Sequence, residues 1–218
     1  MNSDGKSRRF FSWFFAIATI LILVCAPVCR AGQQGDTETI VMIRHGEKPP
    51  EGLGQIDCKG LNRALALTDV LVKRFGKPDF LYASNPSVQD NDGGVLYSYV
   101  RPLATIEPTA VRLGLPVNTQ IGYNRIDELQ KALTQPAYAH ALIFVAWEHK
   151  YLYDFAQRFL KSYGDDPSVI PPWPAGDYDT IYVFKLTRKD GKSHLSFRLE
   201  QEGLNGSLSD ACPGASTR

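Results

Sequence analysis

The sequence predicts an α/β fold, a three-layer α/β/α sandwich with a mostly parallel central sheet. Short β-branched apolar runs alternate along the chain with segments whose apolar residues recur at helical spacing. Such alternation is typical of parallel strands whose two faces are covered by helices. The sequence has 218 residues, 44% of them hydrophobic, which is enough for a sizeable core. No long linker divides the chain after residue 31, so these elements belong to one domain.

The first predicted elements are two strands separated by a helix. Residues 39–43 (Thr-Ile-Val-Met-Ile) form a β-branched apolar run, and residues 80–83 form a second buried strand. Between them, residues 61–74 place leucine and valine at helical spacing. Gly76 and Pro78 follow directly and should end that helix.

The middle of the chain predicts a loop and two helices. Residues 85–98 are rich in Asn, Asp and Gly and predict a long loop. Residues 101–113 are helical in pattern, and residues 114–117 lead into a short strand or turn. The amphipathic residues 126–133 predict a further helix.

The last part of the domain predicts a strand, a helix, a loop and a hairpin. Residues 141–146 (Ala-Leu-Ile-Phe-Val-Ala) are the clearest buried strand, and residues 151–163 have a helical pattern. Residues 165–177 contain Pro-Pro-Trp-Pro and predict a second long loop. Residues 180–187 and 193–199, joined by Lys-Asp-Gly-Lys, predict a β-hairpin.

Residues 1–31 predict an export signal that is not part of the domain. A basic start precedes the uncharged residues 10–29, and small residues up to Ala31 offer a cleavage site. Left uncleaved, residues 10–29 are long enough to anchor the chain in a bilayer, so both readings stay open. Either way we expect an exported protein, periplasmic or secreted, whose only membrane contact is this N-terminal segment.

The rest of the chain divides into a domain over residues 32–202 and a tail over residues 203–218. Once residues 1–31 are removed, Cys58 and Cys212 are the two remaining cysteines. Two cysteines in an oxidising compartment predict a disulfide, which would tie the tail to the domain. The alternative is two free thiols.

The net charge of +1 argues against a nucleic-acid partner.

Polar clusters follow the predicted strands at their carboxyl ends. Arg44 and His45 follow the first strand, and Glu148 and His149 follow the strand that ends at residue 146. Arg101 stands after the loop that follows the second strand. Ligands of open α/β sheets bind beyond the carboxyl ends of the strands, so these side chains are expected to converge on one pocket.

The segment 44–47 (Arg-His-Gly-Glu) at the end of a strand resembles the signature of the histidine phosphatase superfamily, which includes phosphoglycerate mutases and histidine acid phosphatases. Residues 60–64 are similar to the segment that opens the family's first helix. Residues 81–84, followed by Arg101, resemble its second arginine motif, and the strand before His149 resembles the site of its second histidine. The resemblance implies a phosphoglycerate mutase-like fold.

This resemblance, which covers residues 38–186, implies a metal-independent phosphatase that needs no cofactor. His45 would take the phosphoryl group from a small phosphomonoester as a phosphohistidine, which water then hydrolyses. A neutral imidazole is a competent nucleophile near pH 7. Arg44 and Arg101 would offer forked donors to phosphate oxygens, and His149 would add another donor.

The general acid is the point at which the sequence departs from the family. Its members usually protonate the leaving oxygen with a carboxylate from the loop between the second arginine and the second histidine. Residues 118–135 offer only Asp127 and Glu128, both on a helix of exposed pattern. Glu148 is the preferred alternative because it stands at the right end of the sheet. Lys150 replaces a glycine that is common in the family and offers a further phosphate contact.

Several residues carry weaker expectations. Arg63 is expected on a helix face, and Glu47 in either a pocket wall or a solvated loop. Asp90, Asp92 and Gly93 suggest a calcium loop, but the bidentate acid that should follow is missing, so they are expected to be solvated.

Two other functions stay open beside the phosphatase. A phosphomutase would pass the phosphoryl group to a second hydroxyl, although export argues against a metabolic mutase. A catalytically weak or inactive module would use the same arginines only to hold a phosphorylated ligand. The sequence does not identify the substrate. Tyr97, Tyr99 and Trp173 are candidate walls of the pocket mouth or ordinary loop residues.

Overall fold

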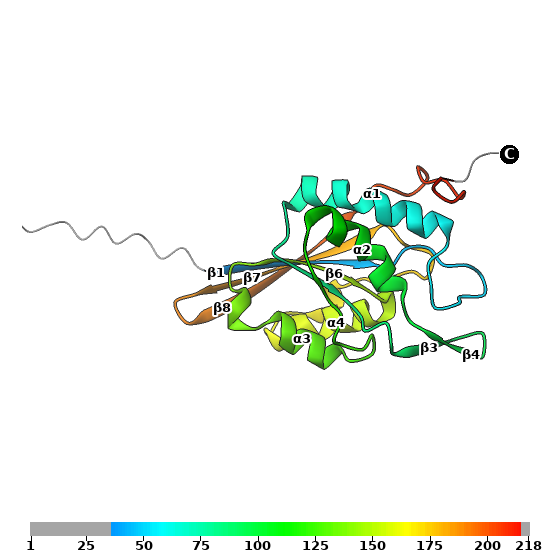
Figure 1. The fold of residues 1–218 in the computed structure, drawn as a ribbon. Coiled ribbons are helices and arrows are strands. Elements are labelled where there is room, and N and C mark those ends of the chain that lie inside the picture. Colours follow the sequence, from blue (N-terminus) through cyan, green and yellow to red (C-terminus); the bar gives the residue numbers. More distant parts are fainter. Residues whose placement is uncertain (1–35, 215–218) are drawn as a thin grey trace, which may run out of the picture. The chain divides into compact units, whose positions relative to one another are not determined.

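The computed structural model describes residues 36–214, which belong to one compact unit. The predicted signal or anchor over residues 1–31 lies outside the described residues. A six-stranded sheet forms the middle layer (Figure 1). Its strands lie in the order β5-β2-β6-β1-β7-β8. β5, β2, β6 and β1 are parallel, β7 pairs antiparallel with β1, and β8 closes the hairpin with β7. The strands are β1 Asp36–Arg44, β2 Phe80–Ala83, β5 Val117–Asn118, β6 Leu142–Trp147, β7 Thr180–Lys189 and β8 Lys192–Gln201.

Helices cover both faces of this sheet, as the sequence predicts. α1 and α2 pack on one face and α3 and α4 on the other (Figure 1). None of the helices within residues 36–214 is long and apolar enough to cross a membrane. The helices are α1 Cys58–Phe75, α2 Arg101–Leu113, α3 Ile126–Leu133 and α4 His149–Ser162.

β1 shows how the strand pattern builds two cores. Ile40 and Met42 belong to the apolar cluster under α3 and α4, whereas Val41 and Ile43 belong to the cluster under α1 and α2. All four side chains are fully buried, because successive residues of a strand point to opposite faces and both faces are covered. A continuous apolar run is therefore what this central strand requires.

Two helices begin earlier than their apolar spacing predicts, because each has a side-chain cap. The carboxylate of Asp57 accepts a hydrogen bond from the Gly60 N–H at 2.8 Å, so α1 begins at Cys58. Glu148 accepts from two N–H groups at the start of α4, so this helix begins at His149 and not at residue 151.

The prediction of a plain loop over residues 85–98 is wrong. β3, Gln89–Asp92, and β4, Val95–Ser98, form an antiparallel hairpin separate from the main sheet. Gly93 and Gly94 between them have φ angles of 63° and 93°, which glycine adopts without steric cost. The strand β3 has the sequence Gln-Asp-Asn-Asp and no apolar alternation, so periodicity does not reveal it.

Two short 3-10 helices, Pro136–Tyr138 and Pro167–Val169, complete the described elements. The second lies inside the predicted loop 165–177.

The predicted disulfide between Cys58 and Cys212 is confirmed. It joins the first residue of α1 to the tail, whose described part runs to residue 214. The Asn62 side chain also donates hydrogen bonds of 2.8 Å to the carbonyls of Ser209 and Ala211. The tail is therefore held against the amino end of α1 at several points.

Non-reducing peptide mapping of the native protein should recover Cys58 linked to Cys212. The bond spans a sequence separation of 154 residues. A closed loop of that length stabilises by roughly 4–5 kcal/mol in the chain-entropy model. Because the tail is peripheral and has other contacts, we expect the double variant C58S/C212S to lose less than this in urea unfolding. Two alkylatable thiols in the native protein would contradict the expectation.

Candidate active site

A cavity of about 350 Å³ lies at the carboxyl ends of β1 and β6. The structure brings the five predicted site residues together around it: Arg44, His45, Arg101, Glu148 and His149. β1 and β6 are parallel neighbours with Arg44 opposite Trp147, so the residues that follow them emerge side by side. Arg101 reaches the same cavity from the first turn of α2.

His45 is almost completely buried at the wall of this cavity. Its backbone N–H donates to the Trp147 carbonyl at 2.9 Å, which extends the pairing of β1 with β6 by one residue. The ring Nδ1 lies 2.7 Å from the carbonyl oxygen of Gly46 and donates to it, because a carbonyl can only accept. The neutral ring therefore carries its proton on Nδ1 and leaves the lone pair of Nε2 for a substrate.

Gly46 allows the close approach that this arrangement needs. A Cβ at this position would lie 2.8 Å from the Cα of Gly60, at the start of α1. The Gly46 N–H donates to the Thr105 hydroxyl at 2.8 Å, and that hydroxyl donates to the Arg101 carbonyl at 2.8 Å. The backbone after His45 is thus attached directly to α2.

The environment of His45 keeps its ring neutral. Burial, with smaller contributions from the nearby charges of Arg44 and Arg101, lowers the pKa of His45 to about 3 against the opposing effect of the Gly46 carbonyl. A histidine whose pKa is lowered is neutral at every pH above that value, so the nucleophilic form is present throughout the neutral range.

An NMR titration should show this directly. The His45 ring signals, assigned by their loss in His45→Ala, should keep the shifts of neutral imidazole through about pH 4–8, whereas free histidine titrates near 6.5. Titration of the His45 ring with a midpoint near that of free histidine would show that burial does not control its charge.

Arg44 is held by the loop before β7. Its Nη1 donates to the carbonyls of Ala175 at 2.6 Å and Asp177 at 2.8 Å, and its guanidinium carbon lies 3.9 Å from the Tyr178 ring centroid. Its Nε is buried without a hydrogen-bond partner among the described residues. Burial lowers the pKa of Arg44, with Tyr178 opposing, but an arginine stays charged. The positive charge of Arg44 is thus held beside His45, and its Nε makes no hydrogen bond to the described residues.

Arg101 is also buried, and acidic residues of the β3–β4 hairpin contact it. Its Nη2 donates to Asp92, its Nη1 lies 3.8 Å from Asp90 Oδ2, and its Nε donates to the Gln55 carbonyl at 3.3 Å. The sequence expectation that Asp90 and Asp92 are solvated is wrong for Asp92, whose side chain is 8% exposed.

Glu148 lies at the cavity, but its carboxylate is already engaged. Oε2 accepts from the Lys150 N–H at 2.7 Å and the Tyr151 N–H at 3.0 Å. Oε1 lies 2.7 Å from His149 Nδ1, which is close enough for an ion pair. The angle between the two groups does not meet that of a hydrogen bond. Burial raises the pKa of Glu148, but the His149 ring and the backbone N–H of the helix outweigh it and leave the pKa lowered. Glu148 thus fits a role in capping α4 and orienting His149 better than a role as a proton donor.

The other two predicted candidates for the acid lie away from the cavity. Asp127 of α3 pairs with Arg158 of α4 at 2.8 Å, and Glu128 of α3 pairs with Arg125, which precedes the helix; all four side chains are exposed. Neither carboxylate lines the cavity that contains His45.

Several cavity residues were not singled out by the sequence as site residues. Lys48, Asn91, Tyr123 and Tyr151 line it, beside Asp90 and Asp92 of the hairpin and the predicted Lys150. Tyr123 donates from its hydroxyl to Asp90 at 3.1 Å, which links two residues of the cavity lining.

The candidate aromatic walls divide between the cavity and the core. Tyr99 lines the cavity, whereas Tyr97 does not. Trp173 packs in the core against Tyr182, with ring centroids 4.4 Å apart. Among residues 36–214, no group of three His, Cys, Asp or Glu side chains is arranged to hold a metal ion.

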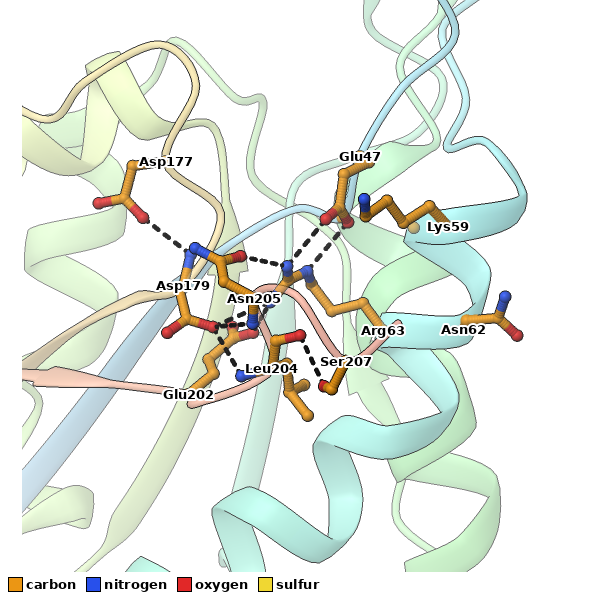
Figure 2. Close-up of polar contacts among 12 residues, drawn as sticks. Glu47, Lys59, Asn62, Arg63, Asp177, Asp179, Glu202, Leu204, Asn205 and Ser207 are labelled. Carbon is orange, nitrogen blue, oxygen red and sulfur yellow. Dashed lines mark hydrogen bonds and ion pairs between the residues drawn. The ribbon is translucent and has the colours of Figure 1, made fainter. Parts of the chain in front are cut away.

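Arg63 lies on α1 and does not line the cavity, as the sequence predicts, but it is buried in an ion-pair network behind the residues that follow His45. Its Nε and Nη2 donate to the two carboxylate oxygens of Glu47 at 2.9 and 2.8 Å, and its Nη1 contacts Glu202 and Asp179 (Figure 2). The Asn205 side chain accepts from Nη2 at 2.9 Å. Glu47 is therefore neither solvated nor a cavity wall, but a link from the residues after His45 to α1.

No protein-family model and no curated protein matches the sequence. Among solved structures, the chain is similar to a putative phosphohistidine phosphatase SixA from Nakamurella multipartitia, with 14% identity, a TM-score of 0.51, and coverage of 75% of this chain and 95% of that one. It is also similar to a putative SixA from Agrobacterium tumefaciens (13% identity, TM-score 0.47, 74% and 97% covered). A mycobacterial glucosyl-3-phosphoglycerate phosphatase with inorganic phosphate matches with 18% identity, a TM-score of 0.46, and 75% and 95% covered. The likeness to the first of these structures shows the fold alone, and the chain has a phosphoglycerate mutase-like α/β fold.

Proposed function

We propose that the protein is an exported phosphatase that hydrolyses a small phosphomonoester through a phosphohistidine on His45. One observation carries this proposal: a buried His45 with its proton held on Nδ1 by Gly46 presents an unprotonated Nε2 in a cavity that also holds Arg44, Arg101 and His149. The fold, shared with a putative phosphohistidine phosphatase, supports it.

The proposed reaction has two displacements at phosphorus. The Nε2 lone pair of His45 forms a P–N bond while the ester P–O bond breaks, and the leaving oxygen takes up a proton. Water then attacks the phosphorus, the P–N bond breaks, and inorganic phosphate leaves. Arg44, Arg101 and the ring of His149 stabilise the charge on the equatorial oxygens in both steps.

Because Glu148 is a weak candidate for the general acid, we expect the protein to prefer phosphomonoesters whose leaving group needs little protonation. Glu148 has a lowered pKa and gives its oxygens to α4 and His149, so it donates protons poorly. Leaving groups that need little protonation should react best. The test is phosphate release by the purified full chain from an aryl phosphate and from a panel of alkyl phosphates, with acid-labile phosphohistidine trapped by rapid alkaline quench. Absence of release from every substrate would contradict the phosphatase proposal.

A phosphate-binding module without turnover is the second candidate, and the state of Glu148 favours it specifically. The Glu148 carboxylate accepts from two N–H groups of α4 and its pKa is lowered, so the described residues of the cavity lack an evident proton donor for the leaving oxygen while Arg44 and Arg101 can still hold a phosphate. Calorimetric binding of inorganic phosphate without release from aryl phosphate would select this function.

Arg101→Ala should lower kcat/KM for an aryl phosphate by roughly a hundredfold, which corresponds to about 3 kcal/mol for one preorganised donor. The loss should appear in kcat as well as in KM, because the donor matters most when charge develops in the transition state. The matched control is Arg112→Ala on the same helix, whose exposed side chain pairs with Asp69. Equal activity of the two variants would contradict a role for Arg101.

A further inference from the structure

The β3–β4 hairpin places a buried carboxylate against Arg101. Asp92 Oδ2 accepts from Arg101 Nη2 and also from the Gly54 N–H at 2.9 Å, and Asp92 Oδ1 lies 3.6 Å from Lys48 Nζ. Both oxygens therefore have partners, and the side chain is only 8% exposed. An aspartate in this state contacts the protein and has little surface left for a substrate.

The loop that receives Asp92 has an unusual backbone. Gly52, Leu53 and Gly54 have φ angles of 80°, 54° and 68°, so a non-glycine residue shares the left-handed conformation of its neighbours. A Cβ on Gly52 would lie 2.2 Å from Asp92 Cγ, and one on Gly54 would lie 2.2 Å from the Ser98 carbonyl oxygen. This loop fits closely around the Asp92 carboxylate, and leucine is held in a costly conformation to complete it.

The same loop also holds the other side of Arg101. The Gln55 carbonyl accepts from Arg101 Nε at 3.3 Å, and the Gly54 carbonyl accepts from the backbone N–H of Val100 at 2.9 Å and of Arg101 at 3.2 Å. Nε and Nη2 are engaged in hydrogen bonds, and Nη1 makes none to the described residues, so Nη1 is the guanidinium nitrogen left for a phosphate oxygen. Nη1 forms only an ion pair with Asp90 Oδ2, at 3.8 Å, which is longer than a hydrogen bond.

We propose that Asp92 is a positioning residue of the phosphate site, which fixes the guanidinium of Arg101 through the loop Gly52–Leu53–Gly54 so that Nη1 faces the substrate phosphate. This inference rests on the proposed function. Asp92 acts through Arg101, because its own oxygens are hydrogen-bonded to Arg101 and Gly54 and paired with Lys48 at 3.6 Å. The hairpin that periodicity does not predict is then what orients the second arginine.

Asp92→Asn removes the charge while keeping the shape, and it should lower kcat/KM for an aryl phosphate at least tenfold. The affinity for inorganic phosphate, measured by calorimetry, should fall by a similar factor. The matched control is Asp69→Asn, which breaks a comparable contact of 2.6 Å to Arg112 on the surface and should leave both quantities unchanged. Wild-type kcat/KM and phosphate affinity in a folded Asp92→Asn protein would overturn the proposal.

A second variant displaces the carboxylate without changing it. Gly52→Ala places a methyl group where Asp92 Cγ lies and should reproduce the loss seen in Asp92→Asn. Gly94→Ala is its control, because this glycine also has a positive φ, of 93°, but a Cβ there would meet nothing within 4 Å. Equal effects of the two alanines would mean that backbone strain, and not the position of Asp92, causes the loss.

A double-mutant cycle with Arg101→Ala separates positioning from an independent role. If Asp92 acts only through Arg101, adding Asp92→Asn to Arg101→Ala should cost no further activity, and the pH profile of Asp92→Asn should keep the wild-type shape. Additive losses, or loss of one limb of the profile, would show that Asp92 meets the substrate itself. Phosphate affinity is measured independently of turnover, so a failed phosphatase proposal, with no activity in the wild type, is distinguished from a failure of the Asp92 proposal.

Discussion

His45→Ala should reduce turnover of an aryl phosphate by at least ~10³-fold while the protein stays folded, since loss of a covalent nucleophile removes most of the chemical advantage of a site. In the proposed reaction the Nε2 of this imidazole forms the P–N bond, and alanine has no atom that can replace it. Because Arg44, Arg101 and His149 remain, inorganic phosphate should still bind. Phosphate release, alkaline trapping of phosphohistidine and calorimetry measure these three expectations separately.

The matched control is His140→Ala, which removes an exposed imidazole that pairs with Asp36 at 3.1 Å. It should keep wild-type turnover, because His140 does not line the cavity. Turnover by His45→Ala above a small fraction of the wild type, or phosphohistidine trapped in that variant, would mean that another group attacks the phosphorus. Unchanged thermal unfolding of both variants excludes misfolding as the cause of the loss.

The strands and the helices of the sandwich were predictable because their signals are local. A fully buried strand such as β1 needs a continuous apolar run, and an amphipathic helix needs apolar residues at helical spacing, so both appear within a few residues of sequence. The rule that ligands bind beyond the carboxyl ends of parallel strands then predicted that His45 and His149 share one site. Their meeting follows from the pairing of β1 with β6.

The rest of the site depends on contacts that no local pattern encodes. Asp92 is polar and stands before Gly93, which is typical of a solvated turn, and only its packing into the loop around Gly54 shows that it is buried. Arg63 has an ordinary place on a helix, but its partners Asp179 and Glu202 lie 116 and 139 residues away in sequence. Charged residues are buried only when they are paired, and pairing at such distances is a property of the fold.

The network around Arg63 connects the residues after His45, the residue that follows the last strand and the tail (Figure 2). Burial raises the pKa of Glu202 to about 8, against the opposing charge of Arg63. Burial also acts to raise the pKa of Asp179, but the N–H groups of residues 203–205 and Arg63 outweigh it and lower the value. One guanidinium thus faces three acidic side chains, Glu47, Asp179 and the fully buried Glu202. Removing Arg63 would leave the buried acids without their cation.

Arg63→Ala should therefore lower the free energy of unfolding by about 3–5 kcal/mol, as expected when one partner of a buried ion pair is removed. Arg74→Ala is the matched control on the same helix, since its partly exposed side chain pairs with Glu200 at 3.4 Å and surface pairs contribute about 0–1 kcal/mol. Urea unfolding of both variants measures the difference. Since Glu47 follows His45 by two residues, the folded fraction of Arg63→Ala should also lose activity, whereas Arg74→Ala should not. Similar unfolding free energies for the two variants would mean that solvent or rearranged side chains satisfy the three carboxylates without Arg63.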